Sequence, residues 1–114
     1  MTTDPFARIA LIRTELTALG LTQPQYWILR HLAPNDLGSN TSARRLDELT
    51  DALEEYLLPG DDLLSDATDL MTRALITRTP DGRLRITPAG QAAHTRVKDN
   101  IPAIKARLEA ASPS

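Results

Sequence analysis

One β-hairpin set among helical patterns constrains the fold of this chain most. Residues 75–79 and 83–87 have the composition and the partial alternation of strands. The turn that joins them, residues 79–82, reads Thr-Pro-Asp-Gly, a turn sequence because proline presets φ and glycine accepts a positive φ. The other patterned segments repeat their apolar residues at helical spacing. The sequence therefore predicts a mainly α fold with one small hairpin.

Two helices are expected at the start of the chain. The first covers residues 4–19, with Gly20 as its C-cap. The second begins at a capping box formed by Thr22 and Gln25, and Pro34 ends it.

Two more helices are expected before the hairpin and one after it. Ser42 can cap the third helix, whose apolar face consists of Leu46, Leu49, Leu53 and Leu57. The fourth covers residues 61–74, with Leu63, Ala67, Leu70 and Ala74 as its buried stripe and Leu64 and Met71 beside them. The last helix covers residues 88–108, and Pro102 is expected to kink it.

This order of elements indicates a winged helix-turn-helix. The third and fourth helices form the helix-turn-helix, and the hairpin after them is the wing. We expect one domain over residues 1–114, in which residues 22–87 form the helix-turn-helix and wing. Residues 6–19 and 88–108 are expected to be flanking dimerisation helices.

Composition excludes several classes of function. The 114 residues carry a formal net charge of -2, which argues against a broadly basic nucleic-acid coat but permits a local basic patch. Cysteine is absent and the two histidines are far apart in the sequence, so no disulfide and no metal site is expected. We find no Gly-rich phosphate loop and no catalytic triad, and expect no enzyme and no cofactor. No apolar run approaches a membrane span, so a cytoplasmic protein with no membrane partner is expected.

Three segments resemble the MarR family of bacterial transcription regulators. Residues 19–32 read LGLTQPQYWILRHL and resemble that family's L-G-L-T-x-x-Q-[WY]-x-[LV]-L-x-x-L entry into its second helix. Residues 45–49 read RLDEL and resemble its L-x-E-L helix start. Residues 75–78 (LITR), 81–83 (DGR) and 84–90 (LRITPAG) resemble its G-L-[IV]-x-R…D-x-R…[LI]-T-x-x-G wing.

The resemblance implies a DNA-binding regulator that acts as a homodimer on duplex DNA. It further implies one reading helix per half-site, an arginine at each wing tip and, more loosely, an unidentified small-molecule input. The reading helix departs from the family, because residues 61–72 contain four aspartates and no Lys or Arg. This departure keeps open an alternative function, a winged-helix protein-interaction module that has lost specific DNA binding.

The candidate DNA-binding residues come from three places in the chain. They are Arg78, Arg83 and Arg85 of the wing, Arg44 and Arg45 at the start of the third helix, and Ser65, Thr68 and Thr72 on the outward face of the fourth. The alternatives are a solvated hairpin in which Asp81 pairs with Arg83, and ordinary surface charge at the two earlier arginines.

The candidate dimerisation residues continue the apolar surface beyond the helix-turn-helix lobe. They are Phe6, Ile9, Ile12, Leu16, Val97, Ile101, Ile104 and Leu108, which a partner surface would cover. Tyr26 and Trp27 are interpreted as core residues, or else as the lining of a ligand cavity.

Overall fold

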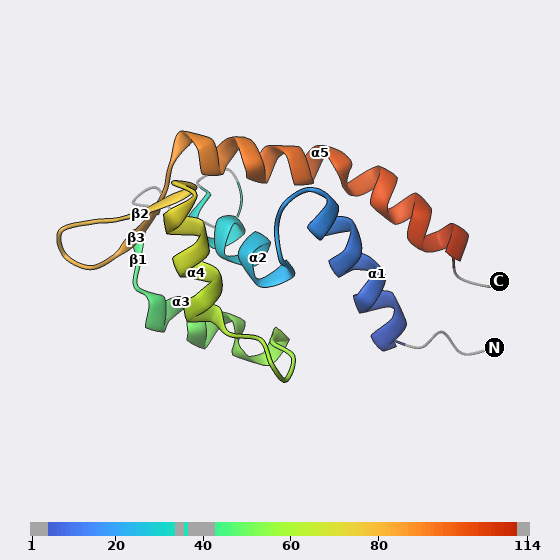
Figure 1. Ribbon diagram of the computed structural model, residues 1–114, viewed down its shortest axis with the longest axis horizontal. Coiled ribbons are helices and arrows are strands. Elements are labelled where there is room, and N and C mark those ends of the chain that lie inside the picture. The colour runs from blue at the N-terminus through green and yellow to red at the C-terminus, as the bar shows by residue number, and fades with distance from the viewer. Residues whose placement is uncertain (1–4, 34–35, 37–42, 112–114) are drawn as a thin grey trace.

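The computed structural model describes residues 5–33, 36 and 43–111. Its elements are α1 (Pro5–Ala18), α2 (Gln23–Leu32), β1 (Ala43–Arg44), α3 (Leu46–Leu53), a 3-10 turn (Glu54–Tyr56), α4 (Leu63–Thr72), β2 (Ile76–Arg78), β3 (Leu84–Ile86) and α5 (Pro88–Ala111). Figure 1 shows a lobe built from α2, α3, α4 and the strands, from which α1 and α5 extend together. The predicted fold class, mainly α with a small β wing, is confirmed.

The junction between α1 and α2 forms as its local sequence predicts. Gly20 has a φ of 89°, and the Leu21 N–H donates to the Leu16 carbonyl at 3.0 Å, which is the Schellman ending of a helix. The Thr22 hydroxyl then accepts from the Gln25 N–H at 3.1 Å, and the Gln25 side chain accepts from the Thr22 N–H at 2.9 Å. The capping box is therefore present.

The start of α3 differs from the prediction. Ser42 and Pro34 lie outside the described residues, and the residue at the N-cap position of α3 is Arg45. Ala43 and Arg44 form β1, which pairs antiparallel with β3 and makes a three-stranded sheet of order β1-β3-β2. The sequence did not predict this strand, because a pairing about 40 residues away leaves no local signal.

The end of α3 also comes earlier than predicted. The α-helix stops at Leu53 and continues as the 3-10 turn. Leu57 therefore lies beyond the helix, although it is still half-buried against the core.

The end of α4 corrects the predicted buried stripe. Leu63, Ala67 and Leu70 are buried, but Ala74 is exposed and has a φ of 59°. The Leu75 N–H donates to the Leu70 carbonyl at 2.9 Å, so Ala74 occupies the left-handed position that ends the helix.

The segment Thr-Pro-Ala-Gly at residues 87–90 fastens α5 to the rest of the lobe. The Thr87 hydroxyl donates to the Ala74 carbonyl at 2.6 Å and accepts from the Gly90 N–H at 3.1 Å. A Cβ at Gly90 would lie 2.0 Å from the Leu75 carbonyl oxygen. Only glycine therefore fits where α5 crosses the link between α4 and β2.

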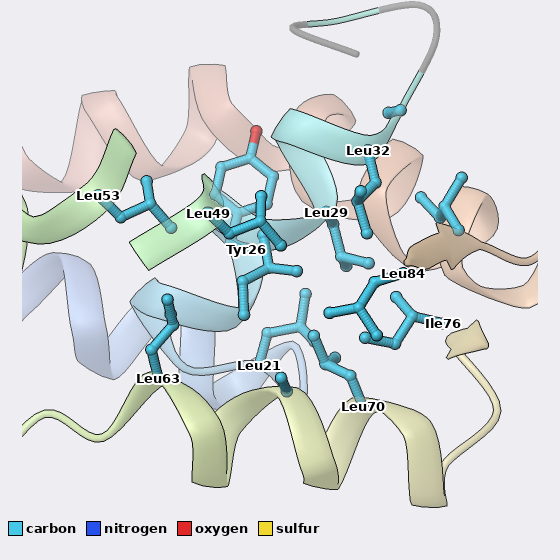
Figure 2. Packing of buried hydrophobic residues seen from close by; sticks show 14 of the residues in the cluster. Leu21, Tyr26, Leu29, Leu32, Leu49, Leu53, Leu63, Leu70, Ile76 and Leu84 are labelled. Carbon is cyan, nitrogen blue, oxygen red and sulfur yellow. The ribbon is translucent and has the colours of Figure 1, made fainter. Parts of the chain in front are cut away.

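The core lies between the helix-turn-helix, the sheet and α2 (Figure 2). Ile28, Leu29 and Leu32 of α2 are fully buried at its centre. The side chains packed around them share the apolar faces of the other elements and are Leu21, Tyr26, Leu49, Leu53, Leu63, Ala67, Leu70, Ile76, Leu84 and Ile86. Leu16 of α1 and Val97 of α5 join the same cluster, so both flanking helices are attached to the lobe.

One polar group is buried where α5 meets α2. His94 is 1% exposed, and its Nε2 lies 2.9 Å from Asp36 Oδ2. Arg30 donates to the same carboxylate oxygen at 3.0 Å. Partial burial alone would raise the pKa of Asp36, but the hydrogen bonds from Arg30 and His94 outweigh it, so this pKa lies below its ordinary value. The buried His94 therefore has a structural role, because it fastens α5 to Asp36.

Candidate nucleic-acid interface

The outward face of α4 includes one leucine and three hydroxyl side chains. Leu64, Ser65, Thr68 and Thr72 are exposed, whereas Leu63, Ala67 and Leu70 turn into the core. This separation follows from the rotation of 100° per residue in a helix. The predicted outward orientation of Ser65, Thr68 and Thr72 is confirmed, while Leu64, expected beside the buried stripe, is 60% exposed.

The two threonine hydroxyls use their hydrogens within the helix. Thr68 donates to the Leu64 carbonyl at 2.8 Å, and Thr72 donates to the Thr68 carbonyl at 3.0 Å. Each hydroxyl oxygen then remains an acceptor toward a molecule placed against α4.

The first two aspartates of this region are held by the chain itself. Asp61 accepts from both terminal nitrogens of Arg13 at 2.9 and 2.8 Å. Asp62 caps α4 by accepting from the Ser65 N–H at 3.2 Å. The charge of Asp61 is therefore paired with Arg13 of α1, and that of Asp62 lies at the N-terminus of α4.

The other two aspartates lie toward the junction of α1 and α2. Asp66 accepts from the Thr22 hydroxyl at 3.0 Å, and partial burial raises its pKa. Asp69 accepts from Gln25 Nε2 at 2.7 Å and from Arg73 at 3.3 Å. The strip of α4 formed by Leu64, Ser65, Thr68 and Thr72, which we call the outer strip, itself carries no formal charge, and Asp69 beside it is 53% exposed.

The arginines of the hairpin differ in exposure and in contacts. Arg85 is exposed between Ala43 and Thr77 on the neighbouring strands. Arg78 is exposed at the end of β2. Arg83 Nε lies 3.2 Å from Asp81 Oδ2, an ion pair without hydrogen-bond geometry, so the pairing considered as an alternative is present. Since α4 leads through a short turn into β2, the outer strip and the wing lie on successive elements (Figure 1).

Arg44 and Arg45 do not lie together. Arg44 is opposite Leu84 in the sheet, and its Nε donates to the His31 carbonyl at the end of α2 at 3.2 Å. Its guanidinium is therefore turned toward the helices of the lobe. Arg45 is exposed at the start of α3, where its N–H donates to the Glu48 side chain at 3.1 Å.

Sequence reasoning missed two exposed side chains near this surface. Arg73 follows α4 and pairs with Asp69, and Leu64 belongs to the outer strip. The helical rotation carried the signal for Leu64, because 100° per residue places it next to Thr68 and away from Leu70.

Solved structures similar to this chain share its arrangement. A MarR-family protein of Mycobacterium tuberculosis, crystallised in complex with DNA, matches 96% of this chain and 82% of its own, with a TM-score of 0.64 and 20% sequence identity. A MarR-family transcriptional regulator from Silicibacter pomeroyi matches 94% of this chain and 70% of its own, with a TM-score of 0.61 and 22% identity. This chain has the MarR fold. No protein-family model and no curated protein matches the sequence.

The order α3, α4, β2 and β3 is the one that the sequence predicted for a helix-turn-helix followed by a wing, and the boundaries of these parts remain a prediction. Within the described residues, no group of acidic and histidine side chains could hold a metal ion. Among the same residues, no helix is long and apolar enough to cross a membrane.

The predicted dimerisation residues are partly covered inside the chain. Leu16, Val97, Ile104 and Leu108 are buried within the single chain. The expectation that these four need a partner surface to cover them is therefore wrong. Ile9, Ile12 and Ile101 are half-buried, and the side chain of Phe6 lies outside what the structure describes. Dimerisation through these residues remains a prediction.

Trp27 lines two hollows in the surface. One of about 190 Å³ lies between α1, α2 and α5, and its walls include Tyr26, Trp27 and Ile101. The other lies between α2 and the end of α3, where the Trp27 and Tyr56 rings are 5.7 Å apart. Tyr26 is a core residue, as predicted, and Trp27 is half-buried.

Proposed function

We propose that this chain is a DNA-binding transcriptional regulator of the MarR type that acts as a homodimer on duplex DNA. The observation that carries the proposal is the uncharged outer strip of α4, which an arginine-bearing wing follows along the chain. The aspartates of residues 61–72 were the main objection to DNA binding, and each of them is engaged by the chain's own groups.

The two surfaces suit different parts of a duplex. Hydroxyl side chains such as Ser65 and Thr68 contact phosphates and base edges when a helix lies in the major groove. Wing arginines such as Arg85 suit the phosphates or the narrow minor groove, where negative potential is concentrated. A local basic patch is sufficient for this, so the net charge of -2 is no obstacle.

The structural neighbours support the same function. One of the two was crystallised in complex with DNA, and the fold that it shares with this chain covers 96% of this chain. This likeness supports the proposal that this chain also binds duplex DNA.

A homodimer follows from the requirements of half-site recognition. Two copies related by a two-fold axis can place two reading helices about one DNA turn apart. The pair of helices α1 and α5, which Figure 1 shows extending from the lobe, is the part we propose to form the interface. Its half-buried residues Ile9, Ile12 and Ile101 would be covered there.

We also propose the hollow between α1, α2 and α5 as the place of a small-molecule input. It is lined mainly by apolar side chains, with Lys105 and Gln23 as its polar members. It lies between the proposed dimer helices and the reading lobe, so an occupant could change their relative position.

The test of DNA binding is the salt dependence of affinity. We expect the purified protein to bind random duplex DNA at low salt and to lose affinity steeply as salt rises, because phosphate contacts release counterions. Arg85→Ala should weaken binding to random duplex and to the best selected site alike, and reduce the salt slope by about 1.

The matched control removes a positive charge elsewhere. Lys98 is exposed on α5, away from the wing, and Lys98→Ala should leave the salt slope unchanged. Failure of the native protein to bind any duplex at low salt would exclude the DNA-binding function and favour the protein-interaction module.

A further inference from the structure

We propose that Leu64 reads thymine, by placing its side chain against the C5-methyl group of a thymine in the major groove. The proposal rests on the function proposed above and names the base chemistry that the outer strip recognises. It makes Leu64 the specificity-determining residue of α4.

The first observation is the exposure of Leu64. Three large apolar side chains are exposed in the described part of the chain, namely Leu11, Tyr56 and Leu64. Leu64 is the most exposed of them, at 60%, and it alone belongs to α4. The core of the lobe is complete without it, since Leu63, Ala67 and Leu70 supply the buried side of the helix.

The second observation is the chemistry around Leu64. Its outward neighbours on α4 are Ser65 and Thr68, so it is a single apolar group set among hydroxyls. Docking surfaces for proteins are usually larger contiguous apolar patches. A lone apolar side chain among hydrogen-bonding groups suits the edge of a base pair better.

The third observation is the shortage of donors on the outer strip. Residues 63–72 contain no Lys, Arg, Asn or Gln, and the hydroxyl hydrogens of Thr68 and Thr72 are used inside the helix. Guanine presents two acceptors to the major groove, and among the outer-strip side chains only the Ser65 hydroxyl has a hydrogen that is not used within the helix. An A·T pair presents the thymine methyl group and the adenine amino group, which match an apolar side chain and a hydroxyl acceptor.

The experiment begins with sites selected by the native protein from a random duplex library. Each thymine of the best site is then replaced in turn by uracil, which removes only the methyl group. We expect one position per half-site at which this replacement weakens binding by about four-fold, the size that the burial of one methyl group predicts. The same replacement should have no effect on the binding of Leu64→Ala.

Two protein variants serve as controls. Tyr56→Ala removes another exposed large side chain, in the 3-10 turn after α3, and should keep the full thymine effect. Leu64→Met keeps an apolar side chain of similar volume and should keep most of it.

Three outcomes would overturn the proposal. They are a selected site in which no thymine methyl affects binding, equal losses for the native protein and Leu64→Ala, and no duplex binding at low salt. The first two leave DNA binding intact and remove only the role of Leu64. The third removes the proposed function as well.

Discussion

At the scale of the residue, Asp61 shows how one carboxylate can join distant parts of the chain. Arg13 of α1 donates to both of its oxygens, and the Leu58 N–H donates to Oδ2 at 2.7 Å. The side chains of Asp61 and Arg13 are 12% and 27% exposed. The hydrogen bond from Arg13, against a smaller opposing effect of burial, holds the pKa of Asp61 below its ordinary value.

We predict that Asp61→Asn lowers the free energy of unfolding by about 1–2 kcal/mol at neutral pH, because it removes a charge-assisted pair that is mostly shielded from water. The pKa is lower in the folded than in the unfolded chain. The stabilisation is therefore present above the unfolded value of about 4 and is lost as pH falls through the folded value. Urea denaturation at several pH values should show the native protein and the variant converging below about pH 4.

The control for this prediction is the exposed pair of the wing. Asp81 and Arg83 are 64% and 42% exposed, and such pairs add little stability. Asp81→Asn should change stability much less than Asp61→Asn. Equal effects of the two substitutions would contradict a special role for Asp61.

No pattern in the sequence could have paired Asp61 with Arg13. The two residues are 48 positions apart, and an aspartate before a helix is explained equally well by the helix dipole. For the same reason, the sequence could not show that the four aspartates of residues 61–72 contact other groups of the chain.

At the scale of the element, the parts that local sequence specifies were predicted correctly. The Gly20 ending, the capping box of Thr22 and the hairpin turn at residues 79–82 depend on neighbours within a few positions. Other errors lie where distant contacts decide. β1 exists because β3 pairs with it, and α3 begins after this strand, with Arg45 at its N-cap position.

Ala74 is a local feature that the helical pattern concealed. Its spacing from Leu70 suits a buried stripe, but its φ of 59° ends the helix. In the MarR pattern that the wing resembles, this position is a glycine. An L-residue with a side chain is strained in the left-handed region, and glycine is not.

We predict that Ala74→Gly raises the free energy of unfolding by about 0.5–1 kcal/mol, because relief of the backbone strain exceeds the added entropy of the unfolded chain. Ala92→Gly is the matched control, since Ala92 is exposed in the interior of α5. This substitution should lower the free energy of unfolding by about 1 kcal/mol. Urea denaturation of the two variants measures both changes. If Ala74→Gly destabilises the protein as Ala92→Gly does, the strain argument is wrong.

At the scale of the whole molecule, the chain is elongated because α1 and α5 extend from the lobe as a pair. Its extents are 52 × 28 × 23 Å. Arg107 of α5 donates to Glu15 of α1 at 2.8 Å, and Arg96 donates to the Leu19 carbonyl at 2.9 Å. Helical periodicity predicted both helices, but it could not show that they cover each other, since an apolar stripe does not identify its partner.

The pairing of α1 and α5 covers their apolar faces incompletely. The hollow between them is lined by Ile12, Ile101 and Ile104, with Lys105 at the same site. Ile104 is 7% exposed, so a charge there would disrupt the helix pair itself. Ile101 is half-buried, so a charge there can reach water in a single chain.

We therefore predict that the native protein is a homodimer and that Ile101→Glu dissociates it. The substituted carboxylate would lie in the proposed interface, where it would lose its hydration without gaining a partner. Sedimentation at tens of micromolar should show a dimer for the native protein and a monomer of unchanged helix content for the variant. Leu64→Glu is the control, because it adds the same charge to an exposed leucine of α4 and should leave the dimer intact. A native protein that sediments as a monomer at that concentration would exclude an interface formed by α1 and α5, and with it the two-fold reading of half-sites.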